Sequence, residues 1–374
     1  MAVRLRRVLM AAAAGVTWLF FLSLQPAGAF HNFQILTPTP EPSPAKITGY
    51  FPAAENVNSL TGLPVEQSEI LNRRPVMVKI SNYPPSVRPQ AGLSYADVVF
   101  EYYIGEGMNR FLAVFYSQDA LRAGSLRSGR LVDAELTSMY QGNLVYGSAD
   151  PRVDEVIEKR LGDRAISHLE VGCPIICGAS DTHLAPWIYV NTSGLSAYAS
   201  KQQEYNTRPD LGGMLFDLSV PVGAPTVEKL GVEYSSVSRG EWHYNYQTSL
   251  YERWQEVNFS VNNMEPLVDQ LGNRPITYDN IVIIFAEYIE FNPTLHEILL
   301  WKNSEGAPAI FFRDGVMSDG FWQVTSQDHP IQFFNRLGLP YGLKPGNTWI
   351  VIANNGSKFN QVKSGVWDLI FNQP

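Results

Sequence analysis

Several arginines and carboxylates stand close together between residues 74 and 130, among apolar runs typical of buried strands. Arginine carries a planar, permanently charged fork of N–H donors that matches carboxylate and phosphate groups. Two carboxylates at a fixed separation are instead the acid and base of glycoside hydrolysis. The segment therefore predicts a site of one of these two kinds. The side chains concerned are Arg74, Arg88, Arg110, Arg127, Arg130, Asp97, Glu101 and Glu106.

A loop with two glycines, GSLRSGR at residues 124–130, leads into a run with helical periodicity over residues 131–141. The first N–H groups of a helix have no partner inside it, and with neighbouring arginines they favour anion binding. The alternative is that the arginines form internal ion pairs with the acids Asp97, Glu101, Asp133 and Glu135. In the first interpretation, the ligand-binding residues are Arg88, Arg110, Arg127, Ser128 and Arg130.

The carboxylates offer a second kind of chemistry. Glu101, with Asp97 or Glu106, is the candidate acid and base of a hydrolase that cleaves peptidoglycan or another glycan. The sequence does not fix the separation of these carboxylates, on which that reaction depends. Serine chemistry is not indicated, because neither Ser125 nor Ser128 has a lysine three residues later or lies in a Gly-x-Ser-x-Gly run.

The chain has two cysteines, Cys173 and Cys177. Their short spacing in an exported chain predicts a local disulfide, and two unpaired thiols are the alternative. A nucleophilic Cys173 is not favoured, because the Ser-x-Gly-Cys pattern of the cysteine L,D-transpeptidases is absent. No histidine and cysteine spacing resembles a zinc signature, so we expect neither a metal nor another cofactor.

A mixed α/β (α+β) domain over residues 58–205 must position the charged side chains. Alternating β-branched residues predict a first strand over residues 75–81, which ends at a Tyr-Pro-Pro turn. Two further strands are joined by a Gly-Glu-Gly hairpin, so a mixed sheet is expected. The later strands are expected at residues 97–103, 110–116 and 143–146, and helices at residues 131–141 and 152–161.

A second domain is expected over residues 225–370, because proline and glycine recur between residues 200 and 230. Short strands separated by tight turns dominate it, which predicts a mostly antiparallel β fold. Five of its tryptophans are expected in the core rather than along a carbohydrate groove, namely Trp242, Trp254, Trp301, Trp322 and Trp349. The expected strands are residues 242–246, 250–254, 281–288, 298–301, 309–312, 320–324 and 349–352.

The first 29 residues have the pattern of an export signal. Three arginines precede an apolar run over residues 8–24, and Ala-Gly-Ala ending at Ala29 is typical of a signal-peptidase site. Cleavage would give a secreted protein, whereas retention would leave a membrane anchor, and both outcomes stay open. A Pro/Thr-rich linker over residues 30–57 follows. We therefore expect an extracytoplasmic protein with membrane contact only through its N-terminal segment.

The composition argues against a nucleic-acid partner. The 374 residues carry 36 Asp and Glu against 28 Lys and Arg, which gives a formal net charge of −8. A nucleic-acid-binding protein needs a basic surface that displaces counterions from phosphates. The length is sufficient for two ordinary domains, each with its own core.

Several short runs carry a family resemblance, namely residues 60–62, 74–76, 88–93, 96–101, 110–115, 127–130, 279–282 and 343–350. Taken together and in order, they resemble the YerB-like family of bacterial extracytoplasmic proteins. The resemblance extends from residue 58 to residue 353 and implies two domains of unknown function, usually in lipoproteins. The sequence departs from the family because no cysteine follows the hydrophobic run, so lipid attachment is not available.

These observations favour a non-enzymatic cell-envelope protein. We expect it to bind an anionic cell-wall component, or an envelope protein, through its arginines, because peptidoglycan stems carry carboxylates and teichoic-type polymers carry phosphates. One alternative is a cell-wall hydrolase that uses the paired carboxylates. Another is a scaffold without a small ligand, in which the arginines serve only folding.

Overall fold

The computed structural model describes residues 54–178, 187–203, 205–301 and 303–374. The predicted export segment and nearly all of the predicted linker lie outside these residues. Within the described ranges, no helix has both the length and the apolar character needed to cross a bilayer.

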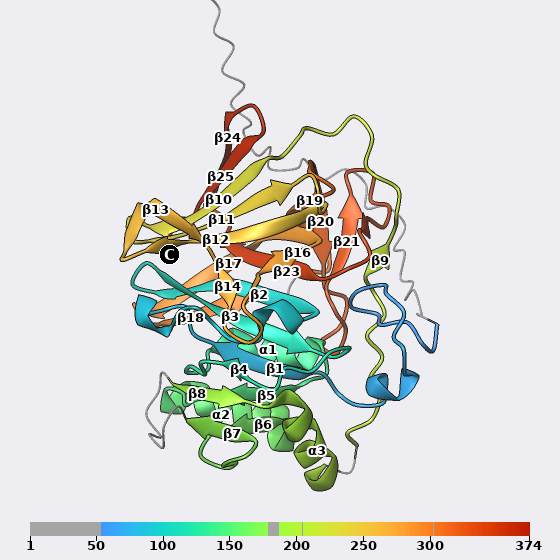
Figure 1. Ribbon diagram of the computed structural model, residues 1–374, viewed down its shortest axis with the longest axis vertical. Helices are drawn as coiled ribbons and strands as arrows, with labels where there is room; N and C mark the ends of the chain where they lie inside the picture. Colours follow the sequence, from blue (N-terminus) through green and yellow to red (C-terminus); the bar gives the residue numbers. More distant parts are fainter. Residues whose placement is uncertain (1–53, 179–186, 204, 302) are drawn as a thin grey trace, which may run out of the picture. The chain divides into compact units, whose positions relative to one another are not determined.

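An eleven-stranded mixed sheet forms the centre of the molecule (Figure 1). Every residue of β1, β2 and β23 is buried. Their nearly continuous apolar runs are typical of strands covered on both faces. In spatial order the strands are β21 (Gln332–Asn335), β20 (Val316–Gln323), β19 (Ala307–Arg313), β17 (Asn280–Asn292), β23 (Thr348–Asn354), β2 (Val98–Gly105), β3 (Met108–Phe115), β1 (Val76–Ile80), β5 (Asn143–Tyr146) and β6 (Ala165–Ser167), with β18 (Leu295–Leu299) beside β17.

The two halves of the chain meet inside this sheet. Strand β2 from the first half pairs in parallel with β23 from the second, with Val98 opposite Thr348 and Tyr102 opposite Ile352. On its other side β2 pairs antiparallel with β3 through the predicted Gly-Glu-Gly hairpin. The large sheet therefore continues across the division that we expected between residues 205 and 225.

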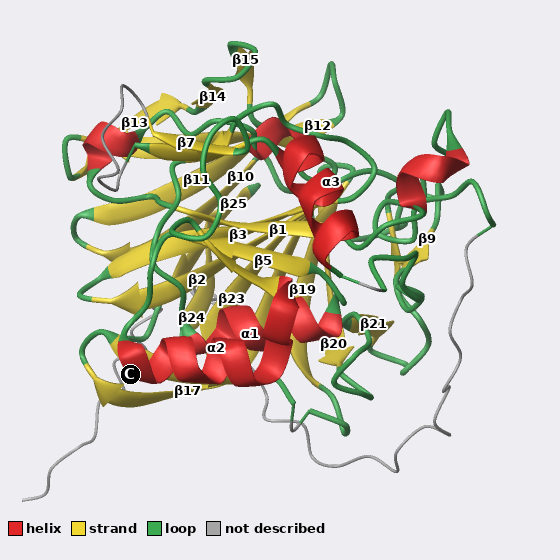
Figure 2. Cartoon of the chain, turned by 90° about the horizontal axis from the view of Figure 1, so that it is seen from below, coloured by secondary structure: helices red, strands yellow, loops and turns green. Residues whose placement is uncertain are grey.

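Helices α1 (Leu131–Met139) and α2 (Pro151–Leu161) lie side by side next to the large sheet (Figure 2). Helix α2 begins with Asp150, whose carboxylate accepts the Arg152 N–H (3.0 Å), and with a proline at the first helical position. Three of its apolar side chains recur at helical spacing and are buried, namely Val153, Ile157 and Leu161. A third helix, α3, spans Thr192–Gln202.

A second, seven-stranded sheet is built from the second half of the chain and is antiparallel except where β10 and β25 pair in parallel. Aromatic rings fill the space between the two sheets, where the Trp349 ring centre lies 5.0 Å from that of Trp242 and 4.9 Å from that of Phe111. The strands are β13 (Ser260–Pro266), β12 (Leu250–Val257), β11 (Ser238–Asn245), β10 (Lys229–Ser235), β25 (Val366–Ile370), β24 (Lys358–Lys363) and β16 (Thr277–Tyr278).

Short elements complete the chain. The remaining strands are β4 (Ala123–Gly124), β7 (Ile176–Gly178), β8 (Ile188–Val190), β9 (Leu215–Phe216), β14 (Val268–Asp269), β15 (Arg274–Pro275) and β22 (Gly342–Leu343), and the 3₁₀ turns are residues 68–71, 85–87, 93–95 and 162–164. The expected mixed sheet in the first half and mostly antiparallel strands in the second are both confirmed.

Candidate anion-binding site

Three neighbouring parallel strands, β1, β5 and β6, place their carboxyl ends at the same end of the large sheet. Ligands of α/β sheets usually bind outside these strand ends. The loop from β4 to α1 is fixed there by two hydrogen bonds. The Arg127 N–H donates to the Lys79 carbonyl (3.0 Å), and the Gly147 N–H donates to the Arg127 carbonyl (2.9 Å). Arg127 therefore lies between the ends of β1 and β5.

Two further arginines contact the same loop. Strand β3 runs antiparallel to β1, so Arg110 near its beginning lies at this end of the sheet, opposite Tyr102 in the register. Arg110 Nη1 donates to the Ser128 carbonyl (3.0 Å), and Arg130 Nη1 donates to the Gly129 carbonyl (3.0 Å). We refer to Arg110, Arg127 and Arg130 as the arginine cluster.

The arginine cluster has no acidic partner. Among the described residues, no carboxylate oxygen lies within 4.0 Å of any of its three guanidinium groups. The Nε atoms of Arg127 and Arg130 are buried and have no hydrogen-bond partner. Arg127 Nη2 makes only a long contact of 3.5 Å with the Tyr83 carbonyl. The fold therefore leaves several charged donors of the cluster unused.

Burial and mutual repulsion both act against these charges. Burial, followed by the charges of Arg130 and Arg127, holds the pKa of Arg110 well below its usual value. Burial also lowers the pKa of Arg130, where Asp133 acts in the opposite direction and Arg127 lowers the pKa further. Burial alone lowers the pKa of Arg127. A bound anion would stabilise all three charged forms.

A fully buried group of Lys79, Tyr102 and Asp133 lies beside the cluster. Asp133 Oδ1 accepts hydrogen bonds from the Tyr102 hydroxyl and from Lys79 Nζ (3.2 Å), and Oδ2 accepts the Arg130 N–H (2.6 Å). Burial lowers the pKa of Lys79 to about 7, although Asp133 raises it. The carboxylate of Asp133 therefore accepts hydrogen bonds from Lys79 and from the backbone at the beginning of α1. It does not pair with the guanidinium groups.

The beginning of α1 adds backbone donors. The N–H groups of Leu131 and Val132 have no acceptor among the described residues. The preceding Gly129 packs closely on α2, because a Cβ atom there would lie 2.8 Å from Ile157 Cδ1 and would require that side chain to shift. The close packing of this loop on α2 holds the helix N-terminus next to Arg130.

Two of the predicted arginines lie elsewhere and are satisfied within the fold. Arg88 is nearly buried and forms an ion pair with Glu256 (2.8 Å), while its Nη1 donates to the Glu256 carbonyl (2.7 Å). Arg74 precedes β1 at the opposite end of that strand and donates to the carbonyls of Gln141 (2.9 Å) and Tyr205 (3.2 Å). Arg88 was predicted to belong to an open cluster, but its donors are taken by the Glu256 carboxylate and by the carbonyls of Glu256 and Asn82, so it is not part of the arginine cluster.

The two candidate catalytic carboxylates on β2 and just before it are enclosed. Glu101 is fully buried, and its oxygens accept from Trp349 Nε1 (2.7 Å), from the Asn109 side chain and from Arg253 (3.2 Å). Asp97 accepts the Tyr116 N–H (2.7 Å) and three further donors. Neither carboxylate is accessible to a polymeric substrate.

The third candidate carboxylate, Glu106, is exposed at the tip of the hairpin between β2 and β3, with a positive φ of 53°. It stands alone there, since Glu101 and Asp97 are buried in the interior. The geometry does not assemble an acid and base pair from these three side chains, as glycoside hydrolysis requires.

Comparison with known families adds a name for the two halves of the chain. The model described as "Protein of unknown function (DUF3048) N-terminal domain" matches residues 60–205, and the corresponding C-terminal domain model matches residues 230–350. Together these matches span most of the chain. The chain belongs to the DUF3048 family.

A relative from Bacillus subtilis is similar to this DUF3048 protein in sequence and in fold. The chain is 27% identical over 299 residues to YerB of Bacillus subtilis (strain 168), which is named as a candidate lipoprotein. The match covers 79% of this chain and 85% of the relative. The crystal structure of the B. subtilis YerB protein is also similar, with a TM-score of 0.66 and 24% identity over 79% of this chain and 96% of that one. The structural similarity shows a shared fold.

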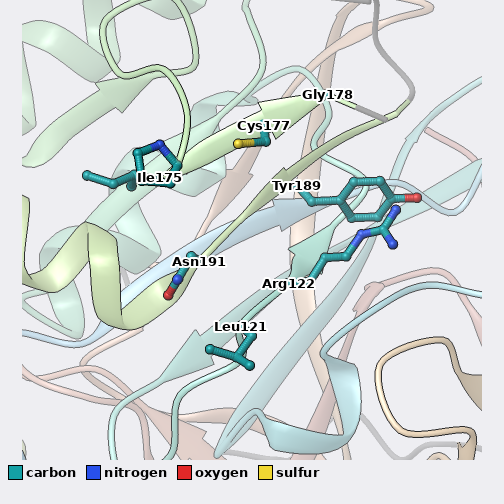
Figure 3. A pocket seen from close by; sticks show the side chains of 8 residues that line it. Leu121, Arg122, Ile175, Cys177, Gly178, Tyr189 and Asn191 are labelled. Carbon is teal, nitrogen blue, oxygen red and sulfur yellow. The ribbon is translucent and has the colours of Figure 1, made fainter. Parts of the chain in front are cut away.

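A disulfide joins Cys173 and Cys177, as the sequence predicts. A separate hollow of about 460 Å³ lies beside it. Arg122 lies over the ring of Tyr189, with its guanidinium carbon 3.8 Å from the ring centre (Figure 3). Residues 179–186, which follow Gly178 in the sequence, lie outside the described residues, and we assign no site to this hollow. Across the described ranges, no group of three or more His, Cys, Asp or Glu side chains is placed to hold a metal ion.

Lys79, Tyr102 and Asp133 lie beside the arginine cluster but were not among the predicted ligand-binding residues. Lys79 offered a signal, because it is the single charged residue in the apolar strand Val76–Ile80. A lysine in a strand covered on both faces needs a buried partner. Asp133 was considered only as a partner for the arginine side chains, whereas its carboxylate contacts Lys79, Tyr102 and a backbone N–H.

Proposed function

We propose that this DUF3048 protein acts at the cell envelope, outside the cytoplasm, and binds an anionic group of a wall component or protein partner through its arginine cluster. The location is supported by the export pattern in the first 29 residues and by the name of its B. subtilis relative, a candidate lipoprotein. The sequence leaves secretion and anchoring through the N-terminal segment as two possible outcomes.

One observation carries the binding proposal: three guanidinium groups meet at the carboxyl end of the parallel strands without a carboxylate partner. Burial of unpaired charge costs free energy, and structural arginines avoid this cost by pairing with acids. Several arginines in this molecule do so, including Arg88 with Glu256 and Arg253 with Glu101. An external anion would supply the charge that the cluster lacks.

The test is binding of the purified full-length protein to isolated bacterial cell walls, with and without their anionic polymers. Each lost charge-assisted hydrogen bond costs about 1.5–3 kcal/mol. We therefore expect the double variant Arg127→Ala/Arg130→Ala to bind at least about tenfold more weakly. Arg336→Ala is the control, since Arg336 is an exposed arginine and its loss removes one positive charge at another position.

The scaffold hypothesis predicts the opposite pattern. If the cluster serves only folding, Arg127→Ala would lower the thermal stability, and wall binding would not depend on Arg127 or Arg130. Unchanged wall binding by the folded double variant would refute the binding proposal.

A further inference from the structure

We propose that the group bound by the arginine cluster is a phosphate that carries two or more negative charges, as a terminal phosphomonoester or a diphosphate does. This inference rests on the proposed function, because it specifies the ligand of the same site. It excludes a single carboxylate and a singly charged phosphodiester as the preferred ligand.

The charge balance at the site favours a ligand with more than one negative charge. The buried pair of Lys79 and Asp133 contributes no net charge when both groups are ionised. The remaining nearby acid, Asp150, forms an exposed pair with Arg152 (2.9 Å). The arginine cluster therefore keeps three positive charges. One negative charge would leave two of them uncompensated, whereas a phosphomonoester carries about 1.5–2 negative charges at pH 7.

The arrangement of the donors favours a phosphate over a carboxylate. Arg110 comes from β3, Arg127 from the loop and Arg130 from the residue that precedes α1, so the guanidinium groups belong to three separately positioned segments. The unpaired N–H groups of Leu131 and Val132 stand beside Arg130. A planar carboxylate has only two oxygens, which one guanidinium already satisfies. A phosphate has three or more oxygens around one centre and can accept from donors on several sides.

The neighbouring carboxylates do not oppose such a ligand. Asp133 is fully buried and is hydrogen-bonded on both oxygens, as described above. Glu101 pairs with Arg253. It is opposite Phe111 in the β2–β3 register, so it lies on the other face of β2 from Tyr102. The acids of the region are therefore either compensated or separated from the cluster by the sheet.

The decisive experiment measures the affinity of the full-length protein for four probe anions by titration calorimetry. The probes are inorganic pyrophosphate, inorganic phosphate, dimethyl phosphate and citrate, all at pH 7.5 and a fixed ionic strength of about 0.15 M, since salt screens these interactions. We expect pyrophosphate to bind most tightly, inorganic phosphate next, and dimethyl phosphate at least tenfold more weakly than pyrophosphate. Citrate carries several charges on separate carboxylates, so it tests charge density against total charge.

The outcomes separate this inference from the proposed function. If citrate or dimethyl phosphate binds as tightly as pyrophosphate, the preference for a multiply charged phosphate is wrong, although an anion site exists. If none of the probes and no cell-wall material binds, both proposals fail. The double variant Arg127→Gln/Arg130→Gln should lose pyrophosphate binding, while Arg336→Gln should keep it. The ranking of probes by the unmodified protein tests the inference even if the double variant does not fold.

A second arm identifies the source of the phosphate. Phosphatidylcholine vesicles that contain phosphatidic acid present a phosphomonoester on a lipid, and vesicles that contain phosphatidylglycerol present a phosphodiester. Flotation with the first vesicles alone would assign the site to a lipid-borne phosphate. Binding of soluble pyrophosphate without flotation would assign it to a phosphate in solution or on a polymer, and stronger flotation with phosphatidylglycerol would contradict the inference.

Discussion

The two faces of strand β2 hold arginine in opposite circumstances. On the face toward the second sheet, Arg253 is fully buried and pairs with Glu101 (3.2 Å), with its guanidinium carbon 5.0 Å from the Trp242 ring centre. On the other face, beginning one residue later at Tyr102, the arginine cluster has no carboxylate partner. Successive side chains of a strand point to opposite faces, so one residue separates the two environments.

The arginine cluster therefore lacks acid partners because of its local arrangement, and not because the molecule has too few acids. Arg239 alone contacts three acids, Glu233, Glu241 and Asp368. An interior arginine that pairs with an acid stabilises the fold, so its removal should lower the free energy of unfolding. The arginine cluster has no acid partner and can pair with an anionic ligand, so its removal should weaken ligand binding. Each prediction below tests one side of this contrast.

The largest effect is expected from Arg253→Met. This change leaves the Glu101 carboxylate buried without its cation, which should lower the free energy of unfolding by about 3–5 kcal/mol. Urea denaturation followed by tryptophan fluorescence measures it. Arg336→Ala, which breaks an exposed ion pair, serves as the control and should cost less than about 1 kcal/mol. A similar small loss for both variants would remove the distinction between paired and unpaired arginines.

The cluster should respond in the opposite way to Arg127→Ala. Because the Arg127 side chain makes one long hydrogen bond and its guanidinium group has no carboxylate partner, we expect almost no loss of unfolding free energy. Pyrophosphate affinity should fall by about 10- to 100-fold, in keeping with one lost charge-assisted interaction of about 1.5–3 kcal/mol. Calorimetric titration and thermal melting of the same preparation provide both values. A large loss of stability with unchanged affinity would place Arg127 with the structural arginines.

Glu135 provides an intermediate case, because it is nearly buried and lies 3.6 Å from Arg160. Burial raises its pKa to about 7. Between pH 4.5 and 7 the folded state holds a proton that the unfolded state has released, so stability falls as the pH rises through this window. Glu135→Gln should therefore be more stable than the unmodified protein at pH 8, by about 1–2 kcal/mol, with little difference at pH 4.5. Urea denaturation at both pH values would show the gain or its absence.

The smallest effect concerns Lys79, whose pKa lies at about 7 because burial and the charges of Arg110 and Arg130 lower it against Asp133. The protonated amine would favour a nearby anion, so affinity should rise as the pH falls through about 7. Sulfate is the suitable probe, since its own charge is constant over this range. We expect its affinity to be roughly threefold to tenfold higher at pH 6 than at pH 8. In folded Lys79→Met this pH dependence should disappear, and its persistence would exclude Lys79 as the cause.

Most local elements of the fold could be predicted from the sequence. The β-branched run after Arg74 forms β1, the Gly-Glu-Gly turn joins β2 to β3, and the loop at residues 124–130 leads into α1 as expected. These features depend on periodicity and turn chemistry within about ten residues. Strand β18 begins at Leu295, three residues before the expected strand at residues 298–301.

The long-range pairings could not be predicted, and they decide which charges are free. Nothing near Glu101 in the sequence indicates that Arg253 will be its partner, or that Glu256 will occupy Arg88. Both pairs form because the second sheet packs across the first, which is a property of the whole fold. For this reason the sequence indicates candidate arginines but cannot separate Arg88 from the arginine cluster.

The pairing of β2 with β23 also sets the order in which the molecule can be completed. A ribosome or a translocation channel releases the chain from its amino end, so Val98 emerges long before Thr348, its partner in the register. Until β23 appears, the early part exposes an open edge of β2. The large sheet is therefore completed only near the end of synthesis, and a fragment that stops after the first region would be a target for proteases and for aggregation.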